Sequence, residues 1–304
     1  MSSPSVQMEG ITFCYGDYKA LDMIDLVVRR GEIHALLGPN GSGKTTLIDL
    51  IAGVRSPDSG MRMINGHDPT VDRPNALGGL RLVAQHTNYE PLLTVHETLQ
   101  WMCGYAGAKA VDISEAIDTV GLNEKINDRI GSLSGGQQRR VDIAYGIAGS
   151  PSLVLLDEPT SGLDTEWRSS VWDGIRELAN RGSTVIITTH DIDEAEALSD
   201  RVTMLRAGRV VTTAPTAELV REAKRPSVVT FAVDGAENPK FETADLHDAG
   251  HELEARTTAP LDTLRELLDW ADSSGAIVRD LSVRPPRLED VYLSETVTKH
   301  TNTK

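Results

Sequence analysis

A glycine-rich loop directly after an apolar run most constrains the fold of this chain. Residues 38–45 read GPNGSGKT, which matches the pattern G-x-x-x-x-G-K-[ST]; they follow the strand-like EIHALL and lead into the helix-like TTLIDLIAG. In loops of this pattern the glycines let backbone N–H groups wrap phosphate oxygens, the lysine reaches the β- and γ-phosphates, and the hydroxyl binds Mg²⁺. We therefore expect a strand–loop–helix phosphate site in which Lys44 and Thr45 have these two roles.

A second glycine-flanked helix start lies at 132–144, which reads SLSGGQQRRVDIA. Ser134 and Gln137 have the spacing of a capping box, so a well-started helix is the simpler interpretation. Two adjacent glycines at a cap lower helix stability, however, unless something approaches the backbone closely. Free amides at a helix start attract phosphate oxygens, and the sequence therefore predicts a second phosphate-binding position.

An acidic pair follows the apolar run LVLL at 153–156. Asp157 and Glu158 come directly after this strand, where open α/β sheets bind their ligands. Asp157 is expected to hold Mg²⁺, and Glu158 to orient or polarise the attacking water of a phosphoryl transfer. A helix-capping pair is the alternative, and the phosphate loop in the same chain makes it the weaker one.

Two further polar residues follow strand-like segments. His190 ends the run TVIITTH and would contact a γ-phosphate if the two apolar strands are neighbours, although a lone histidine is more often structural. Gln85, in RLVAQHTNYEPLLTV, can coordinate Mg²⁺ or water through its amide. From the residues alone, an ordinary polar loop position is the better explanation of Gln85.

Composition excludes several classes of protein. A net charge of −15 and a pI near 4.9 argue against phosphate-backbone binding, so no nucleic-acid partner is expected. No apolar run approaches the roughly 20 residues needed to cross a bilayer, and the first residues lack the pattern of a secretory signal, which predicts a cytosolic chain. Cys14 and Cys103 stand far apart, without the spacing of a disulfide framework or a zinc site.

The pattern along the 304 residues predicts two domains. The runs at 153–156 and 184–189 are typical of strands buried on both faces of a parallel sheet, which predicts a doubly wound α/β core over 1–221. A helical subdomain at about 88–140 is inserted into this core, and a hairpin is expected at 56–69. VVTFAV, LDTLRELLDWA and AIVRDLSV predict a small α+β module over 222–304.

Taken together, these motifs resemble the nucleotide-binding subunit of ABC transporters over about residues 6–215. They are FCYG at 13–16, GPNGSGKT, the Gln85 loop, LSGGQQRR, LVLLDEP, SGLD at 161–164 and TTH. The resemblance implies an ABC-type P-loop NTPase, with a mixed sheet core and an inserted helical subdomain. It implies a transport-coupled ATP hydrolase with ATP and Mg²⁺ as cofactors.

In this family two such domains meet head to tail, so the glycine-capped helix of one closes over the ATP of the other. The resemblance implies that Tyr15 stacks on adenine, Gln85 senses the membrane partner and Asp164 bridges the two sites. The implied catalytic residues are Glu158, His190, Lys44 and Gln85, and the implied metal ligands are Thr45, Gln85 and Asp157. The implied nucleotide-binding residues are Tyr15, Gly38, Pro39, Asn40, Gly41, Ser42, Gly43, Lys44, Thr45, Thr46, Ser134, Gly135, Gly136, Gln137 and Asp164.

The resemblance also implies partners: a second copy of the chain and a separately encoded membrane permease, which would hold the protein at the cytoplasmic side of the cell membrane. A groove beside the Gln85 loop, with Tyr89, Leu92 and Leu93, is expected to receive the permease. Trp101 and Tyr105, four apart on one helix, are expected to pack locally instead.

The segment VRPPRLEDVYL at 283–293 is similar to the tail of ATPase subunits from bacterial drug, antibiotic and lipid exporters. Its simpler interpretation is a proline-initiated helix with Leu288, Val291 and Tyr292 packed inward. Export is therefore the expected direction, by analogy. The alternatives are an importer ATPase, a soluble ABC ATPase acting on ribosomes or DNA, and a nucleotide switch without turnover, against which Glu158 and His190 argue.

Overall fold

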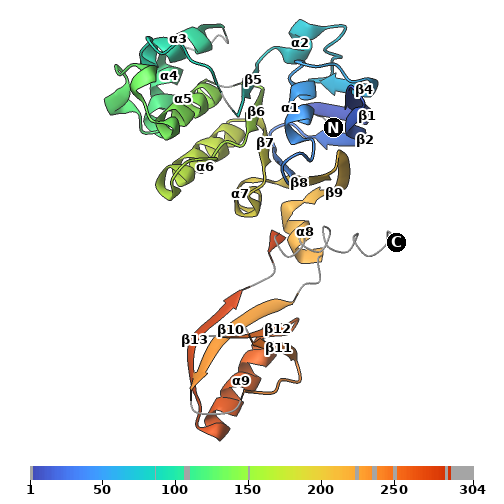
Figure 1. Cartoon of the computed structure of the whole chain (residues 1–304), viewed down its shortest axis with the longest axis vertical. Coiled ribbons are helices and arrows are strands. Elements are labelled where there is room, and N and C mark those ends of the chain that lie inside the picture. Colours follow the sequence, from blue (N-terminus) through green and yellow to red (C-terminus); the bar gives the residue numbers. More distant parts are fainter. Residues whose placement is uncertain are drawn as a thin grey trace. The chain divides into compact units, whose positions relative to one another are not determined.

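The chain forms two compact units, Met1–Pro215 and Thr216–Lys304, in the computed structural model (Figure 1). A short helix, α8 (Thr216–Glu222), begins the second unit, and the expected division at 221/222 lies at its other end. The residues that the structure describes are 3–85, 87–105, 110–149, 151–222, 226–234, 238–248, 252–284 and 287–288.

The first unit opens with a three-stranded antiparallel sheet in the order β2-β1-β4. Its strands are β1 (Val6–Tyr15), β2 (Tyr18–Val28) and β4 (Ser59–Ile64). The expected hairpin at 56–69 is wrong, because β4 pairs along its length with β1 and only the bridge Ile64↔His67 joins it to the chain that follows. The long, largely apolar strand β1 is therefore a better pairing partner for β4 than the short polar segment that follows β4.

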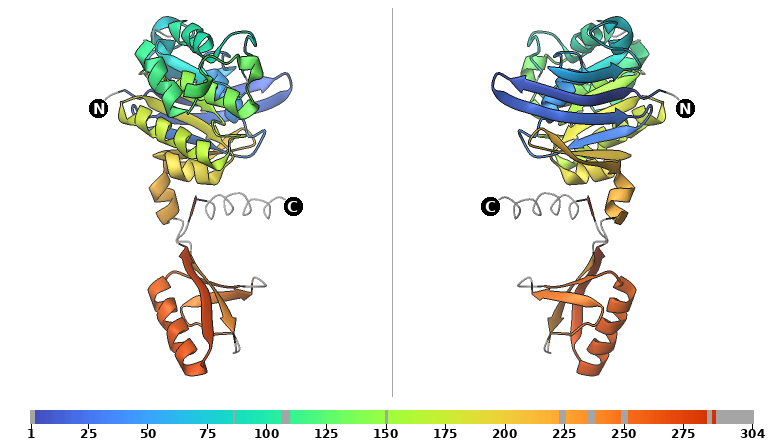
Figure 2. Two further views of the ribbon diagram at one scale, coloured as in Figure 1. Left: turned by 90° about the vertical axis from the view of Figure 1, so that its left-hand side faces the viewer. Right: turned by 90° about the vertical axis from the view of Figure 1, so that its right-hand side faces the viewer.

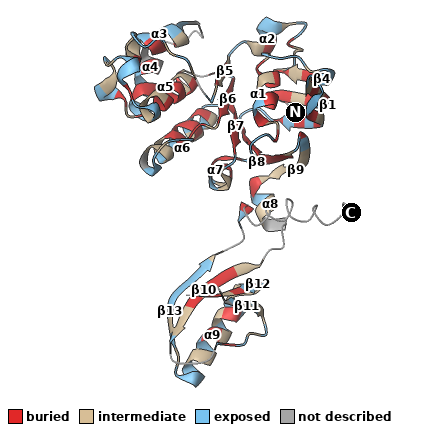
Figure 3. Ribbon diagram, in the orientation of Figure 1, coloured by how far each residue is buried: buried red, intermediate tan, exposed pale blue. Residues whose placement is uncertain are grey.

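The main sheet has six strands in the order β5-β6-β7-β3-β8-β9. The first five are parallel and β9 is antiparallel, which confirms a mixed sheet. Every residue of β3, β6 and β7 is buried, as expected for strands covered on both faces (Figure 3). The six strands are β3 (Ile33–Leu37), β5 (Leu80–Val83), β6 (Leu153–Asp157), β7 (Thr184–Thr189), β8 (Arg201–Arg206) and β9 (Arg209–Pro215).

The two sheets share one hydrophobic core with helix α1 (Lys44–Ile51), whose residues Leu47, Ile48, Leu50 and Ile51 are buried in it. Figure 2 shows the blue strands β1 and β2 crossing one side of the main sheet. Helix α2 (Arg73–Leu77) contributes Ala76 to this core, whereas α6 (Thr165–Asn180) and α7 (Ile192–Leu198) contact strands of the main sheet, α6 at β7 and α7 at β3 and β7. This packing fixes the start of α1, and with it the phosphate loop, against the ends of the parallel strands.

The helical subdomain lies beside strand β5 (Figure 1). It consists of α3 (Val95–Tyr105), α4 (Ala110–Thr119), the 3-10 turns Asn123–Lys125 and Ile130–Ser132, and α5 (Gly135–Ile147). Helix α5 also contacts β5 and β6, so it belongs to both the subdomain and the core. The residues that open α5 are therefore held rigidly with respect to the main sheet.

The second unit is a four-stranded antiparallel sheet in the order β11-β12-β10-β13. One helix covers it, and Phe231 and Leu267 meet in its core. Leu288 is buried, whereas Val291 and Tyr292 lie outside the described residues. Among the helices that the structure describes, none is long and apolar enough to cross a membrane. The elements are β10 (Ser227–Asp234), β11 (Ala244–Asp248), β12 (Leu253–Thr257), α9 (Pro260–Ser274) and β13 (Ile277–Arg284).

Candidate nucleotide-binding and hydrolytic site

The phosphate loop leaves β3 after Leu37 and enters α1 at Lys44. Gly43 has a φ of 106°, and a Cβ atom there would come within 2.7 Å of the Leu21 side chain, so only glycine fits. The first N–H groups of α1 lack partners within the helix and are exposed to an anion, while the helix dipole adds positive potential. The loop therefore has the backbone of an anion site.

Lys44 lies inside this loop, and neutral oxygens hold its ammonium group. Its Nζ donates to the carbonyl oxygens of Gly38 at 2.8 Å and of Pro39 at 3.2 Å. Burial lowers the pKa of Lys44, and the negative charges of Glu158 and Asp157 oppose that shift. A cation held by carbonyls rather than by a carboxylate remains able to bind phosphate.

Ser42 supplies an independent indication of a ligand. The residue is 2% exposed, and its Oγ has no hydrogen-bond partner among the described residues. An unsatisfied buried hydroxyl costs about 1–3 kcal/mol, which a bound phosphate oxygen would recover. The phosphate loop thus fits a nucleotide on the evidence of its own side chains.

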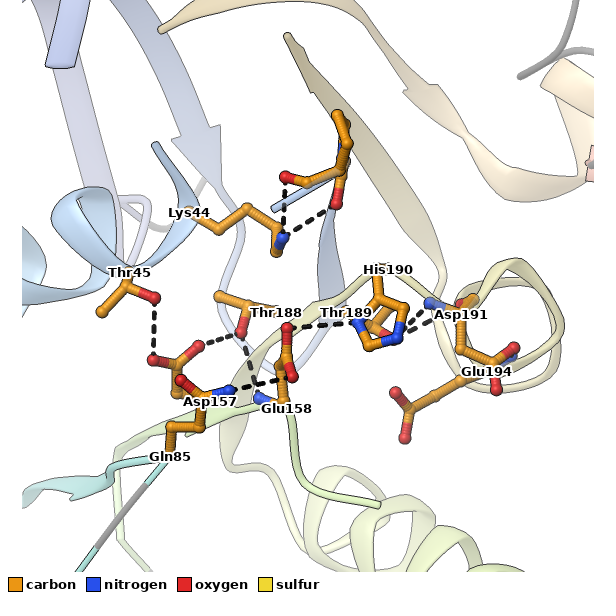
Figure 4. A network of polar contacts seen from close by, with 12 residues as sticks. Lys44, Thr45, Gln85, Asp157, Glu158, Thr188, Thr189, His190, Asp191 and Glu194 are labelled. Carbon is orange, nitrogen blue, oxygen red and sulfur yellow. Dashed lines mark hydrogen bonds and ion pairs between the residues drawn. The ribbon is translucent and has the colours of Figure 1, made fainter. Parts of the chain in front are cut away.

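Thr45 and Asp157 meet where the loop approaches the end of β6 (Figure 4). Thr45 Oγ1 donates to Asp157 Oδ2 at 3.0 Å, and Thr188 Oγ1 donates to Asp157 Oδ1. Hydroxyl and carboxylate oxygens are the donors that Mg²⁺ prefers, with water and phosphate completing its octahedron. The pair fits a magnesium ion bound beside the phosphates.

Glu158 occupies an unusual backbone conformation at the same edge. Its φ of 50° is left-handed, which costs a non-glycine residue about 1–3 kcal/mol and is concentrated at functional sites. Its N–H donates to Thr188, to the backbone oxygen and to Oγ1, both at 3.1 Å. Its carboxylate accepts from Gln85 Nε2 at 3.1 Å and lies 3.2 Å from His190 Nδ1 (Figure 4). The carboxylate is thus held between two side chains that can also contact water and phosphate.

Of these residues, Lys44, Thr45, Gln85 and Glu158 line one open cleft of about 310 Å³, together with Tyr15 and Tyr18. Tyr15 is 42% exposed, packs edge-on to Phe13 with ring centroids 5.0 Å apart, and lies beneath the Arg55 guanidinium at 4.9 Å. Its hydroxyl is 3.4 Å from Thr46 Oγ1. An exposed ring fixed in this way can stack on a nucleobase.

Comparison with known proteins agrees with this geometry. A family profile described as "ABC transporter" matches residues 21–161. The daunorubicin/doxorubicin resistance ATP-binding protein DrrA of Streptomyces peucetius is 33% identical, over 96% of this chain and 92% of the relative. The chain belongs to the ABC transporter ATP-binding family. It is an ABC-type ATPase.

Two further likenesses extend this result. Nod factor export ATP-binding protein I of Cupriavidus metallidurans is 33% identical, over 96% of this chain and 97% of the relative. A solved ATP-binding cassette, described as a dimer in a post-hydrolysis state with ADP and Pi, is 28% identical and has a TM-score of 0.63. It covers 69% of this chain and 98% of its own length. The likeness to the curated relatives therefore includes the C-terminal unit, whereas this structural likeness spans less of the chain.

The family's glycine-capped helix start is well formed in this ABC ATPase. Ser134 Oγ accepts from the Gln137 backbone at 3.3 Å, and Gln137 Oε1 accepts from the Ser134 backbone at 2.9 Å, a complete capping box. None of Ser134, Gly135, Gly136 and Gln137 lines the cleft around Lys44, and Figure 1 shows α5 well apart from α1. Asp164 also lies outside the cleft lining and caps α6 through Trp167 N at 3.1 Å. One copy of the ABC ATPase therefore brings together only part of the expected site.

Sequence reasoning gave no role to two residues of this edge. Thr188 faces Asp157 in the register of β6 and β7 and holds both acidic residues. Its place in TTH gave no sign of this role, because the pairing of Thr188 with Asp157 is set by strand register. Arg139 approaches the same loop from α5, and only its membership of LSGGQQRR could have indicated it.

Proposed function

We propose that this ABC ATPase powers export of a drug-, antibiotic- or lipid-like molecule through a separately encoded permease. The named relatives support this direction, since one belongs to daunorubicin/doxorubicin resistance and another to Nod factor export. The likeness extends over 96% of the chain, the second unit included. The protein would then work at the cytoplasmic side of the cell membrane, held there by the permease.

The single observation that carries hydrolysis is the position of Glu158, between Gln85 and His190 and beside the pair Thr45–Asp157. Bound ATP supplies the γ-phosphate that water attacks. Glu158 orients that water, and His190 contacts the phosphate. The remaining roles follow the geometry of the cleft: Thr45, Asp157 and Gln85 bind Mg²⁺, Lys44 binds phosphate oxygens, and Tyr15 stacks on the base.

The working form in this proposal is a homodimer with two equivalent sites. The exposed start of α5, with Ser134 and Gly135, is free to close over a nucleotide held by a second copy. ATP then joins the copies while its γ-phosphate is intact, and hydrolysis removes the contacts that hold the closed state. Asp164, at the start of α6, is proposed to bridge the two sites.

The permease is proposed to dock on the helical subdomain. A cavity of about 430 Å³ lies beside Tyr89, Leu93 and Trp101. Trp101 is 63% exposed and Leu92 66% exposed, so the expected core packing of Trp101 is wrong, and the side chain of Tyr105 lies outside the described residues. An exposed tryptophan beside an apolar cavity is typical of a surface that binds another protein.

Replacement of Glu158 tests the hydrolytic assignment. Glu158→Gln keeps the size and hydrogen bonds of the side chain but removes its charge, so we expect ATP to bind and hydrolysis to fall steeply. Gel filtration in Mg-ATP should then show a trapped dimer, whereas Lys44→Ala, the control, should remain monomeric under the same conditions. Unimpaired steady-state hydrolysis by Glu158→Gln would remove Glu158 from this role.

Membrane recovery tests the transporter assignment. The chain coexpressed with its permease should sediment with membranes, and the chain alone should not. Trp101→Glu places a charge in the apolar cavity and should abolish recovery while leaving the thermal stability unchanged. Association with ribosomes that persists in high salt would instead support the soluble class.

A further inference from the structure

Arg139, on helix α5, is buried against the loop that carries Glu158. The residue is 7% exposed, and its guanidinium donates to four backbone carbonyls. Nη2 donates to Asp157 O at 2.6 Å and Glu158 O at 2.9 Å. Nε donates to Pro159 O at 3.2 Å, and Nη1 donates to Ala84 O at 2.6 Å. One side chain thus holds three consecutive carbonyls of the catalytic loop.

These contacts hold Glu158 in its strained backbone conformation. The left-handed φ of 50° persists only if the surrounding structure fixes it on both sides. Thr188 holds the Glu158 N–H from strand β7, and Arg139 holds the carbonyls from α5. The planar five-donor fork of arginine suits this task, since no other side chain can satisfy several carbonyls in one plane.

The Arg139 contact to Ala84 also reaches the residue before Gln85. The two side chains that meet at 3.1 Å, Gln85 and Glu158, are therefore attached to backbone segments held by the same guanidinium. A shift of Arg139 would displace both partners of that contact. The position of the Glu158 carboxylate therefore depends on the position of Arg139.

Polar contacts connect Arg139 to two further residues. Asp142, one turn along α5 and 5% exposed, places Oδ2 at 3.5 Å from Arg139 Nη1. Tyr89 donates its hydroxyl to the other oxygen, Oδ1, of Asp142. Burial raises the pKa of Tyr89, and the charge of Asp142 raises it further, so Tyr89 stays protonated and donates. Tyr89 also lines the cavity of about 430 Å³ on the helical subdomain.

We propose that Arg139 is a positioning residue for Glu158, and that Tyr89, through Asp142, makes this positioning respond to whatever fills the cavity. The first half concerns the isolated ATPase. The second half rests on the proposed docking of the permease. A partner helix that moves the Tyr89 ring would shift Asp142 and Arg139, and through them the catalytic loop.

A matched control distinguishes the positioning role of Arg139 from a merely structural one. Arg81, on β5, is also buried at 3% exposed, and its guanidinium also bonds backbone carbonyls of α5, those of Tyr145 and Ala148. Those carbonyls lie at the far end of the helix from the catalytic loop. Arg139→Gln and Arg81→Gln thus each remove a buried guanidinium that joins α5 or its C-cap to the core, but only Arg139 bonds the loop that carries Glu158.

The experiment compares these variants in the purified full-length protein. For Arg139→Gln we expect kcat to fall about 100-fold with little change in KM, the loss typical of a displaced catalytic group. Arg139→Lys should recover part of kcat, because one ammonium replaces only part of the fork. Without nucleotide, amide hydrogen exchange at residues 157–161 should speed up in Arg139→Gln and not in Arg81→Gln. Equal kcat in Arg139→Gln and Arg81→Gln at equal loss of Tm would overturn the assignment.

Tyr89→Phe tests the connection to the cavity. This variant keeps the ring that lines the cavity and loses only the hydroxyl bound to Asp142. We expect normal membrane recovery with the permease, but loss of the change in ATPase rate that the permease causes in the wild type. Wild-type stimulation in Tyr89→Phe would overturn the relay. A failure of the docking proposal is distinguishable, because the wild-type chain itself would then not be recovered with membranes.

Discussion

At the scale of single residues, Glu194 is a buried acid that hydrolysis does not use. It is 2% exposed and accepts from Thr160 Oγ1 at 2.6 Å and from Trp172 Nε1 at 3.4 Å. Burial raises the pKa of Glu194 above its ordinary 4.5, and the charge of Asp191 adds to the rise. The folded protein therefore binds this proton more tightly than the unfolded chain. The resulting stabilisation is present below about pH 4.5 and is lost as the pH rises through the folded-state pKa.

Glu194→Gln should therefore stabilise the protein at neutral and alkaline pH. The amide oxygen can still accept from Thr160 and Trp172, while the cost of burying a charge disappears. We expect a gain of about 1 kcal/mol, which raises Tm by about 2–4 °C at high pH. The gain should shrink as the pH falls, because wild-type Glu194 then takes up a proton. Thermal melts across this range provide the measurement. Asp193→Asn, exposed on the same helix, should show no such gain, and a pH-independent gain in Glu194→Gln would contradict the explanation.

How far the site could be predicted depends on what holds each residue. Lys44, Thr45 and Asp157 belong to local patterns, and the structure brings them into one cleft edge with Glu158. Thr188 was missed because its role depends on the register of β6 and β7, which no local pattern records. Arg139 was missed because its carbonyl partners lie 18 to 55 residues away in sequence.

At the scale of elements, one aromatic side chain joins the helical subdomain to α6. Trp167 packs against Gly121, whose φ is 62°, and the Arg140 guanidinium lies over the indole at 3.9 Å from the ring centroid. Arg140 also donates to the carbonyls of Val120 and Gly121, both at 3.2 Å. The missing side chain at 121 is what lets the indole approach, so this contact depends on glycine.

Gly121→Ala should weaken this junction. The added Cβ would overlap the Cη2 and Cζ3 atoms of Trp167, and the left-handed backbone would add strain. We expect a loss of about 1–3 kcal/mol in the free energy of unfolding, measured by urea titration. In the double variant Gly121→Ala/Trp167→Leu the overlap is absent, so the combined loss should be smaller than the sum of the single losses. Strict additivity would show that the two residues do not meet.

The strand pattern was predictable where a strand is buried on both faces. β3, β6 and β7 are nearly continuous apolar runs, and the sequence indicated all of them. β11 and β12, which read ADLHD and LEART, were missed, since each carries charged residues and depends on its neighbours for pairing. The order of the strands was not predictable either, because β3 pairs with β7 and β8 across more than 100 residues.

At the scale of the whole molecule, the first unit carries the two parts of the proposed reaction site at different places. Lys44 and Glu158 line the cleft, and Ser134 opens α5 elsewhere. In the proposed head-to-tail pair of copies, the Lys44 half of each would meet the Ser134 half of the other, and the symmetry of the pair would give two sites. Neither half alone can enclose a nucleotide.

Mixing two inactive variants should therefore restore hydrolysis. Lys44→Ala destroys the phosphate half of its own copy, and Ser134→Arg blocks the helix start that serves the other copy. Each variant alone forms only defective sites. A mixed dimer contains one site with both defects and one intact site, built from Lys44 of one copy and Ser134 of the other. Lys44→Ala alone stays monomeric in ATP, but the mixed dimer has one intact site that ATP can join, so part of the wild-type activity, at most about half, should return.

The controls for this mixing experiment distinguish a site built from two copies from a complete site within one copy. A double variant that carries both Lys44→Ala and Ser134→Arg leaves no intact site when paired with the wild type or with either single variant, whereas a site contained within one chain would survive in the pair with the wild type. Activity should therefore return only in mixtures that supply one intact Lys44 and one intact Ser134 on different chains. It should also rise with total protein concentration, since assembly precedes turnover. A mixture that stays inactive, or a dilute monomer that hydrolyses ATP at the full rate, would place the complete site within a single chain and contradict the dimer.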